Sequence, residues 1–357
     1  MRLLSFAIVA AVLASGCGRE TPRAAPLAVR IAEIADVNTA GAFVNSIALT
    51  RDGSRLAMGQ RNGSIRIWTT GTDEPATFGQ SQGRDRQAIV DLAFGPSGEL
   101  LASLGRHGEG TVRLWRPEAS TWGQVGTVAV GRCVGLRFDG SGDRLAVMCE
   151  REVVVIDVAT RQLSARFTSS HRESLTAFDL SANGTRLVTA GHEGDVTVWD
   201  AVAATPLHQF SVAGSRRPGP PPRGVPAPEV WAVVVALSPD GSRAAAVTIE
   251  GTVYVWDLMT GAELLVDAHP DAAGPPTGSL RFTEDGRLLA PKGDRHGMRL
   301  FDLSRKSARV AAEGAKAYHT VAITDDATGF AAVTSALESG KLTYDVEIWR
   351  MQPPAGS

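Results

Sequence analysis

The segment GHEGDVTVWD, residues 191–200, has two possible interpretations. Its histidine and carboxylates, His192, Glu193, Asp195 and Asp200, are residue types used for metal binding and acid–base chemistry. Its second half, ending in VTVW, instead has the composition and alternation of a short β-strand. The two interpretations can be separated by asking whether the pattern recurs along the chain.

The pattern recurs seven times. Each copy has a turn signal with a short strand before it and two strands after it, and the signals are TRDG 50–53, GPSG 95–98, DGSG 139–142, SANG 181–184, SPDG 238–241, TEDG 283–286 and the weaker TDDATG 324–329. The third strand of each copy ends at an aromatic or large apolar residue, at Trp68, Trp115, Ile156, Trp199, Trp256, Phe301 and Trp349. Four short strands in each unit of about 40–45 residues are typical of a propeller blade.

The endings Trp199-Asp200 and Trp256-Asp257 make the chain resemble the WD-repeat family, over nearly everything from Leu27 to Met351. The resemblance implies an all-β fold, a seven-bladed β-propeller over residues 27–352. The blades are expected at roughly 43–79, 88–128, 132–168, 172–212, 230–266, 278–312 and 318–351. The last repeat stops after its third strand, whereas an orphan strand, 27–34, precedes the first. We expect this N-terminal strand to complete the last blade, because ring closure removes exposed sheet edges.

The family resemblance also gives the opening segment a structural meaning. It implies a hydrogen-bonded chain within blade 4 that consists of His171, Thr189, Glu193 and Trp199, with Glu193 standing where the family has aspartate. Each link would satisfy a buried polar group that is otherwise costly. We therefore interpret residues 191–200 as one element of a repeat and expect no catalytic role for them. His192 is not a member of this series of hydrogen bonds.

One face of the ring is the candidate partner-binding surface. Three histidines, His107, His192 and His296, fall in turns between second and third strands. A proline-rich insertion, 213–229, connects blades 4 and 5 and contains Arg216, Arg217 and Arg223. Proline-rich segments are recurrent recognition elements, although a disordered insertion without a role remains the alternative. A shared metal site is not predicted, because alternate blades lie far apart.

Two cysteines flank the DGSG turn. If Gly140, Ser141 and Gly142 form a three-residue loop, Asp139 faces Asp143, and Cys133 then lies directly opposite Cys149 on the neighbouring strand. A disulfide is possible in an exported protein. Two buried thiols are the alternative, because a one-residue bulge would destroy this alignment.

The N-terminus is expected to lie outside the fold. Residues 1–16 combine one positive charge with an apolar run too short to span a membrane, which is typical of a secretory signal peptide. The run ends in LASGC, which resembles the bacterial lipobox and implies diacylation at Cys17. Residues 17–26 then form a polar tether, and residues 353–357 a C-terminal tail. Gly18, in place of aspartate, favours outer-membrane over inner-membrane sorting, with a periplasmic body.

The composition and the motifs of the chain limit the classes of function that we expect. With 36 basic and 38 acidic side chains, the chain lacks the basic excess of a nucleic-acid binder. We identify no nucleophile elbow, and the HExxH, P-loop and CxxC motifs are absent. No acidic cluster begins the innermost strands, whose first residues are Asn45, Gln87, Arg132, Ser174, Trp231, Thr277 and His319. We predict no catalytic residue, cofactor or metal, and a monomeric, envelope-anchored lipoprotein that acts as a non-catalytic scaffold for a protein or peptide. The alternatives are a propeller hydrolase or lactonase with a metal at the channel mouth, and a small-ligand sensor.

Overall fold

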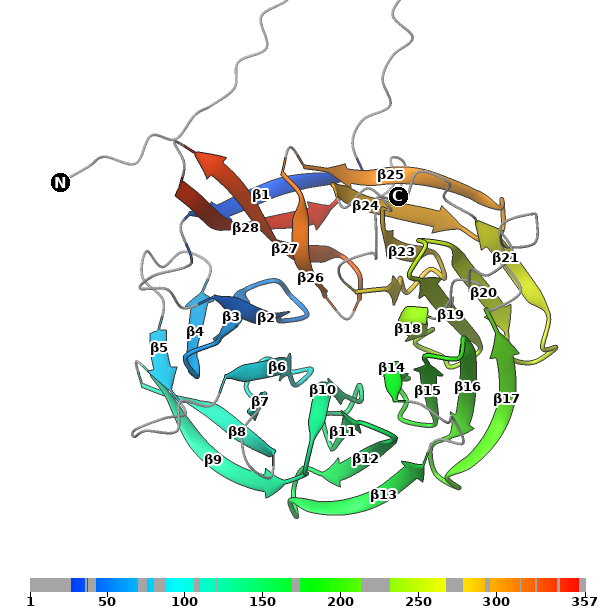
Figure 1. Ribbon diagram of the computed structural model, residues 1–357, viewed down its shortest axis with the longest axis horizontal. Helices are drawn as coiled ribbons and strands as arrows, with labels where there is room; N and C mark the ends of the chain where they lie inside the picture. Colours follow the sequence, from blue (N-terminus) through cyan, green and yellow to red (C-terminus); the bar gives the residue numbers. More distant parts are fainter. Residues whose placement is uncertain are drawn as a thin grey trace, which may run out of the picture.

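The computed structural model describes residues 27–35, 37, 43–69, 76–79, 88–105, 110–119, 121–168, 174–212, 232–267, 279–292, 296–314, 316–324, 326–338 and 341–352. These residues form 28 strands in seven four-stranded antiparallel sheets. Figure 1 shows the sheets as blades around a common axis, which confirms the predicted all-β, seven-bladed propeller. In the described part of the chain, no helix has the length and apolarity needed to cross a membrane.

The innermost strands line the axis of the ring. They are β2 (Val44–Leu49), β6 (Ile89–Phe94), β10 (Cys133–Phe138), β14 (Leu175–Leu180), β18 (Ala232–Leu237), β22 (Arg281–Phe282) and β26 (Tyr318–Ile323). In six blades the register of this strand against its neighbour shifts near the start of the strand, so that one residue is skipped. Such a bulge bends a strand and increases its twist.

The second strands form the middle of each blade and are the most buried. They are β3 (Arg55–Gln60), β7 (Leu101–Gly105), β11 (Arg144–Cys149), β15 (Arg186–Gly191), β19 (Arg243–Thr248), β23 (Leu288–Pro291) and β27 (Gly329–Glu338). Each hydrophobic core cluster joins residues of two neighbouring blades; one, for example, joins Leu104 of β7 to Leu145 of β11. The core is therefore a series of interfaces between blades, in which both faces of a sheet are covered.

The third strands carry the aromatic residues at the ends of the repeats. They are β4 (Ser64–Thr69), β8 (Thr111–Glu118), β12 (Glu152–Asp157), β16 (Asp195–Asp200), β20 (Val253–Asp257), β24 (Gly297–Asp302) and β28 (Lys341–Met351). The outer strands are more exposed. They are β5 (Ala76–Gly79), β9 (Thr121–Ala129), β13 (Gln162–Thr168), β17 (Thr205–Ser211), β21 (Glu263–Asp267), β25 (Ser307–Glu313) and β1 (Ala28–Ile34).

The first and last strands of the chain close the ring. β1 pairs antiparallel with β28, from Ala28 opposite Met351 to Ile34 opposite Val346. In Figure 1 the blue β1 lies against the red end of the chain. The core cluster between this last blade and the first joins Val333 to Met58. The predicted closure of the last blade by the N-terminal strand is confirmed.

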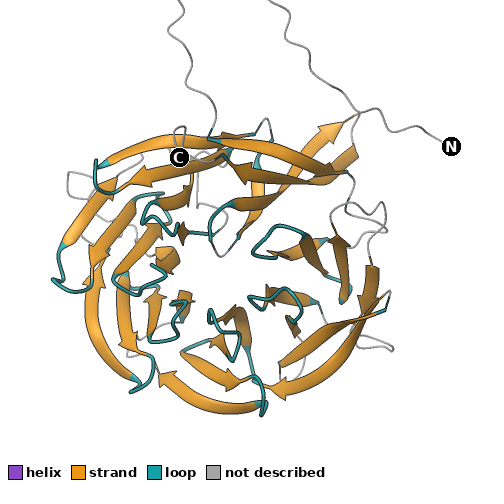
Figure 2. Ribbon diagram, turned by 180° about the vertical axis from the view of Figure 1, so that it is seen from behind, coloured by secondary structure: helices purple, strands orange, loops and turns teal. Residues whose placement is uncertain are grey.

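The antiparallel order gives the ring two different ends. We call the hairpin face the end that carries the turns between first and second strands, such as residues 50–54, and between third and outer strands, such as residues 201–204. Backbone hydrogen bonds join the two kinds of turn; for example, Ala201 N donates to Thr185 O at 2.9 Å. We call the opposite end, where residues 192–194 turn between β15 and β16, the loop face. Figure 2 draws the ring from behind, with short turns near the axis and at the rim.

Candidate binding surfaces and channel

The opening segment forms a buried hydrogen bond inside blade 4. Trp199 Nε1 donates to Thr189 Oγ1 at 2.9 Å, and the two residues are 6% and 1% exposed. Blade 2 repeats the arrangement with a serine, because Trp115 Nε1 donates to Ser103 Oγ at 2.9 Å. Thr189 and Trp199 therefore hold neighbouring strands together, as the resemblance implied.

The other two members of the expected chain are not found with them. Glu193 is exposed, because it lies on the β15–β16 turn, which passes through Gly194 at φ +82°. An exposed carboxylate satisfies no buried donor, so Glu193 does not have the expected buried role. His171 lies outside the described residues.

Replacing Thr189 by alanine is expected to lower the free energy of unfolding by about 1–2 kcal/mol, because it leaves the buried Trp199 N–H without an acceptor. Thr189→Ser is the matched control and should stay near wild type, since Ser103 fills this role in blade 2. Glu193→Ala should also have no effect. Urea unfolding followed by tryptophan fluorescence measures all three, and equal midpoints for the alanine and serine variants at position 189 would contradict the assignment.

The histidines of the proposed binding face are only partly placed. His192 and His296 are half-buried, and both precede third strands, on blades 4 and 6. His107, Arg216, Arg217 and Arg223 lie outside the described residues, as do Cys17, the tether and the tail. The insertion's flanking strands, β17 and β18, end and begin at Ser211 and Ala232 on the loop face. His192 and His296 thus share a face but belong to blades that are not neighbours.

Cys133 and Cys149 form a disulfide, with their sulfur atoms 2.04 Å apart. The predicted loop is wrong in detail, because Asp139 N donates to Arg144 O at 3.0 Å and Phe138 pairs with Leu145. This turn is one residue wider than expected. The bulge between Cys133 and Gly135 then takes up the extra residue and puts Cys133 opposite Cys149. The bulge expected to destroy the alignment instead restores it.

A polar cavity of about 400 Å³ runs along the axis, between the innermost strands. Asp91 lies in its wall and accepts hydrogen bonds from Ser46 Oγ at 2.8 Å and from Leu136 N at 2.8 Å. Ser46, Asp91 and Leu136 belong to blades 1, 2 and 3. Burial raises the pKa of Asp91, while the hydrogen bonds from Leu136 and Ser46 oppose that rise. This carboxyl group therefore ties three consecutive blades together.

Asp179 does the same on the other side of the axis. Its carboxylate accepts from Leu237 N at 3.0 Å and from Arg281 at 3.0 and 3.2 Å. The guanidinium Nε of Arg137 lies 3.0 Å from the same carboxylate. Asp179 is 1% exposed and its partners come from blades 3, 5 and 6. One buried carboxylate is thus shared by four blades.

These two carboxylates define what the channel can do chemically. Each accepts several hydrogen bonds from the protein itself. Their oxygen atoms are therefore used within the fold and are poorly placed to act as a general base. Among the residues that the structure describes, no group of three or more His, Cys, Asp or Glu side chains converges to hold a metal ion. The channel polar groups are best explained as connections between blades.

The sequence analysis missed Arg137, Asp179 and Arg281, although a signal for them exists. Each is the second-to-last residue of its innermost strand, whereas four of the seven repeats have alanine there, at Ala48, Ala93, Ala236 and Ala322. Three charged side chains at a position otherwise occupied by alanine indicate a pairing across the axis. Their identity as partners depends on the ring, which brings the inner strands of blades 3, 4 and 6 together at the axis.

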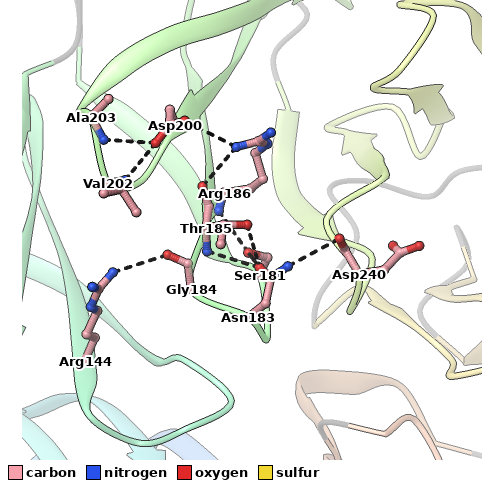
Figure 3. A network of polar contacts seen from close by, with 10 residues as sticks. All are labelled: Arg144, Ser181, Asn183, Gly184, Thr185, Arg186, Asp200, Val202, Ala203 and Asp240. Carbon is pink, nitrogen blue, oxygen red and sulfur yellow. Dashed lines mark hydrogen bonds and ion pairs between the residues drawn. The ribbon is translucent and has the colours of Figure 1, made fainter.

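Polar contacts also join neighbouring blades on the hairpin face. Figure 3 shows those around blade 4: Arg144 of blade 3 donates to Gly184 O at 3.4 Å, and Asn183 donates to Asp240 O of blade 5 at 3.4 Å. Within blade 4, Arg186 pairs with Asp200 at 3.5 Å. The same kind of link recurs between blades 1 and 2, where Arg55 donates to Gly98 O at 2.8 Å. The turns of the hairpin face therefore help to hold neighbouring blades together.

Two segments of the chain, residues 36–69 and 162–200, match the family model described as "WD domain, G-beta repeat". The second match begins at β13, the outer strand of blade 3, and ends at the third strand of blade 4. The sequence repeat is therefore one strand out of step with the blade. This offset leaves a single strand at the N-terminus to complete the last blade.

Relatives and solved structures show the same likeness. Echinoderm microtubule-associated protein-like 1 of Homo sapiens is 22% identical over 316 residues, which are 86% of this chain and 34% of the relative. The guanine nucleotide-binding protein subunit beta of Arabidopsis thaliana is 22% identical over 278 residues, which are 69% of this chain and 64% of the relative. This chain thus spans about a third of the human relative and less than two thirds of the plant relative.

A chain in the solved structure "Crystal Structure of Mitotic Checkpoint Complex" matches with a TM-score of 0.69 at 13% sequence identity. The match covers 98% of this chain and 100% of that chain. At this identity the likeness concerns the fold. The chain is therefore similar in sequence repeats and in architecture to WD-repeat propellers.

Proposed function

We propose that this chain is a non-catalytic protein-interaction scaffold that a lipid on Cys17 holds at the bacterial envelope, preferentially at the outer membrane. The observation that carries the non-catalytic part is the commitment of Asp91 and Asp179 to bonds between blades. The acids best placed for chemistry in the channel are thereby used to hold the ring. We therefore expect partner binding to use the outer surface of the ring.

The scaffold role draws support from the relatives. The name of one relative associates it with microtubules, another is named as a subunit, and the solved structure is of a complex. Because fold alone does not determine function, the proposal also needs a surface. The loop face is the better candidate, since it carries His192, His296 and the exposed Glu193, and since β17 and β18 meet the arginine-bearing insertion there.

The anchor rests on the sequence of the N-terminus. The apolar run and LASGC support export and acylation of Cys17, and Gly18 supports sorting to the outer membrane. Acylation with more than one chain makes membrane attachment stable. The body, tethered through residues 17–26, would then face the periplasm.

In-cell crosslinking tests the binding surface, and fractionation of the same cells tests the lipid anchor. A photoreactive residue at Glu193, on the loop face, is expected to capture one reproducible set of envelope proteins, which replacement of 214–228 by a short Gly-Ser linker removes or weakens. The same group at the exposed Gln209, on the outer strand β17, is the control and should not capture that set. In the same cells, Cys17→Ser should move the protein from the membrane pellet to the soluble fraction.

The results separate the claims. Identical capture from positions 193 and 209 would remove the loop face as the binding surface. Capture that survives the linker replacement would remove the insertion as the binding element. Retention of the Cys17→Ser variant in the membrane pellet would contradict the lipid anchor without affecting the scaffold role.

A further inference from the structure

Two apolar side chains stand out on the hairpin face. Met259 is 85% exposed and Val202 is 70% exposed, more than any of the other large hydrophobic side chains that the structure describes. They occupy the same position in adjacent blades, three residues after Trp199 and Trp256. The two turns between third and outer strands therefore present neighbouring apolar tips at the rim.

Hydrogen bonds from their own turns hold these tips in place. Asp200 accepts from Val202 N and Ala203 N, both at 2.9 Å, and Figure 3 shows this turn. Asp257 accepts from Met259 N at 3.0 Å and from Thr260 N at 2.8 Å. The N–H groups of Ala203 and Val202 hold the pKa of Asp200 below its usual range. The apolar side chains are thus displayed by ordered turns whose carboxylates already have partners.

Cations flank the apolar tips on both sides. In blade 3 the corresponding turn ends in the exposed Arg161, and in blade 6 it contains the exposed Arg305 and Lys306. Arg305 is 81% exposed, although its guanidinium lies 3.2 Å from Asp302. Apolar side chains flanked by arginine and lysine are the composition of surfaces that lie in a membrane interface.

The tether leaves from this same end of the ring. Leu27 precedes β1, and its carbonyl accepts from Gln352 N at 2.7 Å, beyond the end of β28. The third strand of a blade ends on the hairpin face, so the chain toward Cys17 departs from there. Residues 18–26 can extend over at most about 30 Å. An acyl group on Cys17 would keep this face within that distance of the bilayer.

We propose that the hairpin face lies against the phospholipid bilayer that holds Cys17, so that the loop face points away from the membrane. Val202 and Met259 enter the interfacial region, while Arg161 on one side and Arg305 and Lys306 on the other contact lipid phosphates. This orientation rests on the proposed lipid anchor. It leaves the proposed partner-binding face accessible from the periplasm.

Several acidic groups of the hairpin face are paired with cations or accept hydrogen bonds within their own turns. Among those nearest the axis, Glu284 pairs with Arg51 at 2.6 Å and Glu99 pairs with Arg55 at 2.8 Å. At the rim, Asp157 accepts from Thr160 N at 2.7 Å, in the same way as Asp200 and Asp257. Arg161 and Lys306 are exposed at the rim, and Arg305 is exposed beside Asp302.

The test uses the acylated full chain, reconstituted into phosphatidylethanolamine–phosphatidylglycerol vesicles, with an NBD fluorophore on one introduced cysteine. At Met259→Cys the emission is expected to shift to the blue and to be quenched by spin-labelled lipid. At Glu193→Cys, on the loop face, it should show neither effect. A third probe, Ala159→Cys, occupies the equivalent exposed position of blade 3 and reports on the same rim with Val202 and Met259 intact. Adding Val202→Ser and Met259→Ser to that probe should abolish its shift.

Each outcome decides the orientation. A shift at position 193 instead of 259, or none at either on protein that stays bound to vesicles, overturns it. An unchanged shift at position 159 in the double serine variant also overturns it, because the apolar pair would not be the contact. If mass spectrometry finds Cys17 unmodified and the protein washes off the vesicles, the anchor fails and the orientation falls with it. Circular dichroism of each variant confirms that the ring is intact.

Discussion

Replacing Asp179 by alanine is expected to lower the free energy of unfolding by about 3–5 kcal/mol, the usual cost of breaking a buried ion pair. Arg281 is only 8% exposed in its side chain and would keep its charge without the carboxylate that now lies 3.0 Å away. Leu237 N would lose its acceptor as well. Because these groups belong to different blades, the loss loosens the ring across its axis. The shift in the urea midpoint of unfolding measures it.

A matched pair on the surface provides the control. Arg51 and Glu284 also form an arginine–carboxylate pair, but they are 52% and 68% exposed in their side chains. Glu284→Ala should therefore cost less than about 1 kcal/mol. The double variant Asp179→Leu with Arg281→Met removes the two most buried charges and should recover part of the loss. Arg137, whose side chain is 30% exposed, keeps its charge in both variants. If Asp179→Ala and Glu284→Ala shift the midpoint equally, Asp179 does not tie the blades together.

Removing the disulfide is expected to cost about 3 kcal/mol, the loop-closure entropy for cysteines about 16 residues apart. The Cys133→Ala, Cys149→Ala double variant should unfold at lower urea than wild type by the amount that this free energy predicts. Both cysteines are buried, at 6% and 7% exposure, so the alanines also lose some packing.

Treatment with a reductant distinguishes the contribution of the disulfide bond from that of side-chain packing. Treating wild-type protein with a phosphine reductant should lower its midpoint toward that of the double variant, whereas the double variant itself should not respond. Mass spectrometry under non-reducing conditions should find the two cysteines linked. Free thiols at both positions, or a wild-type midpoint that ignores the reductant, would contradict this prediction.

Much of the fold was predictable because the repeats are internal copies of one another. The turn signals and the aromatic ends of the third strands, from Trp68 to Trp349, give the number of blades without any structure. The missing strand after Trp349 and the orphan strand at residues 27–34 together imply closure, which the pairing of β1 with β28 confirms. Local pattern suffices here, since a strand, a turn and the next strand are neighbours along the chain.

The side-chain arrangements were less predictable, because they depend on the conformation of turns and bulges and on which blades meet in the ring. Glu193 has the sequence position of a buried link, yet the turn through Gly194 exposes it. Which side chain of a tight turn faces the blade depends on the backbone conformation of the turn and cannot be read from composition. The cysteine pair was placed by a loop that is one residue too short, and the bulge beside Val134 compensates. Bulges depend on how an inner strand bends around the axis, which is a property of the whole ring.

The segment GHEGDVTVWD shows which features the sequence determines and which depend on the tertiary structure. By itself the sequence determined that it is one element of a sevenfold repeat, because periodic strands and turns are written in local residue order. It also determined that Trp199 lies near the end of the third strand of a blade. Only the tertiary structure decided that Asp179, and none of the acids of this segment, is a buried carboxylate shared between blades. Burial and charge pairing depend on which side chains meet across the axis, and closing the ring brings residues of blades 3, 4 and 6 together from positions up to 144 residues apart in the chain, Arg137 to Arg281.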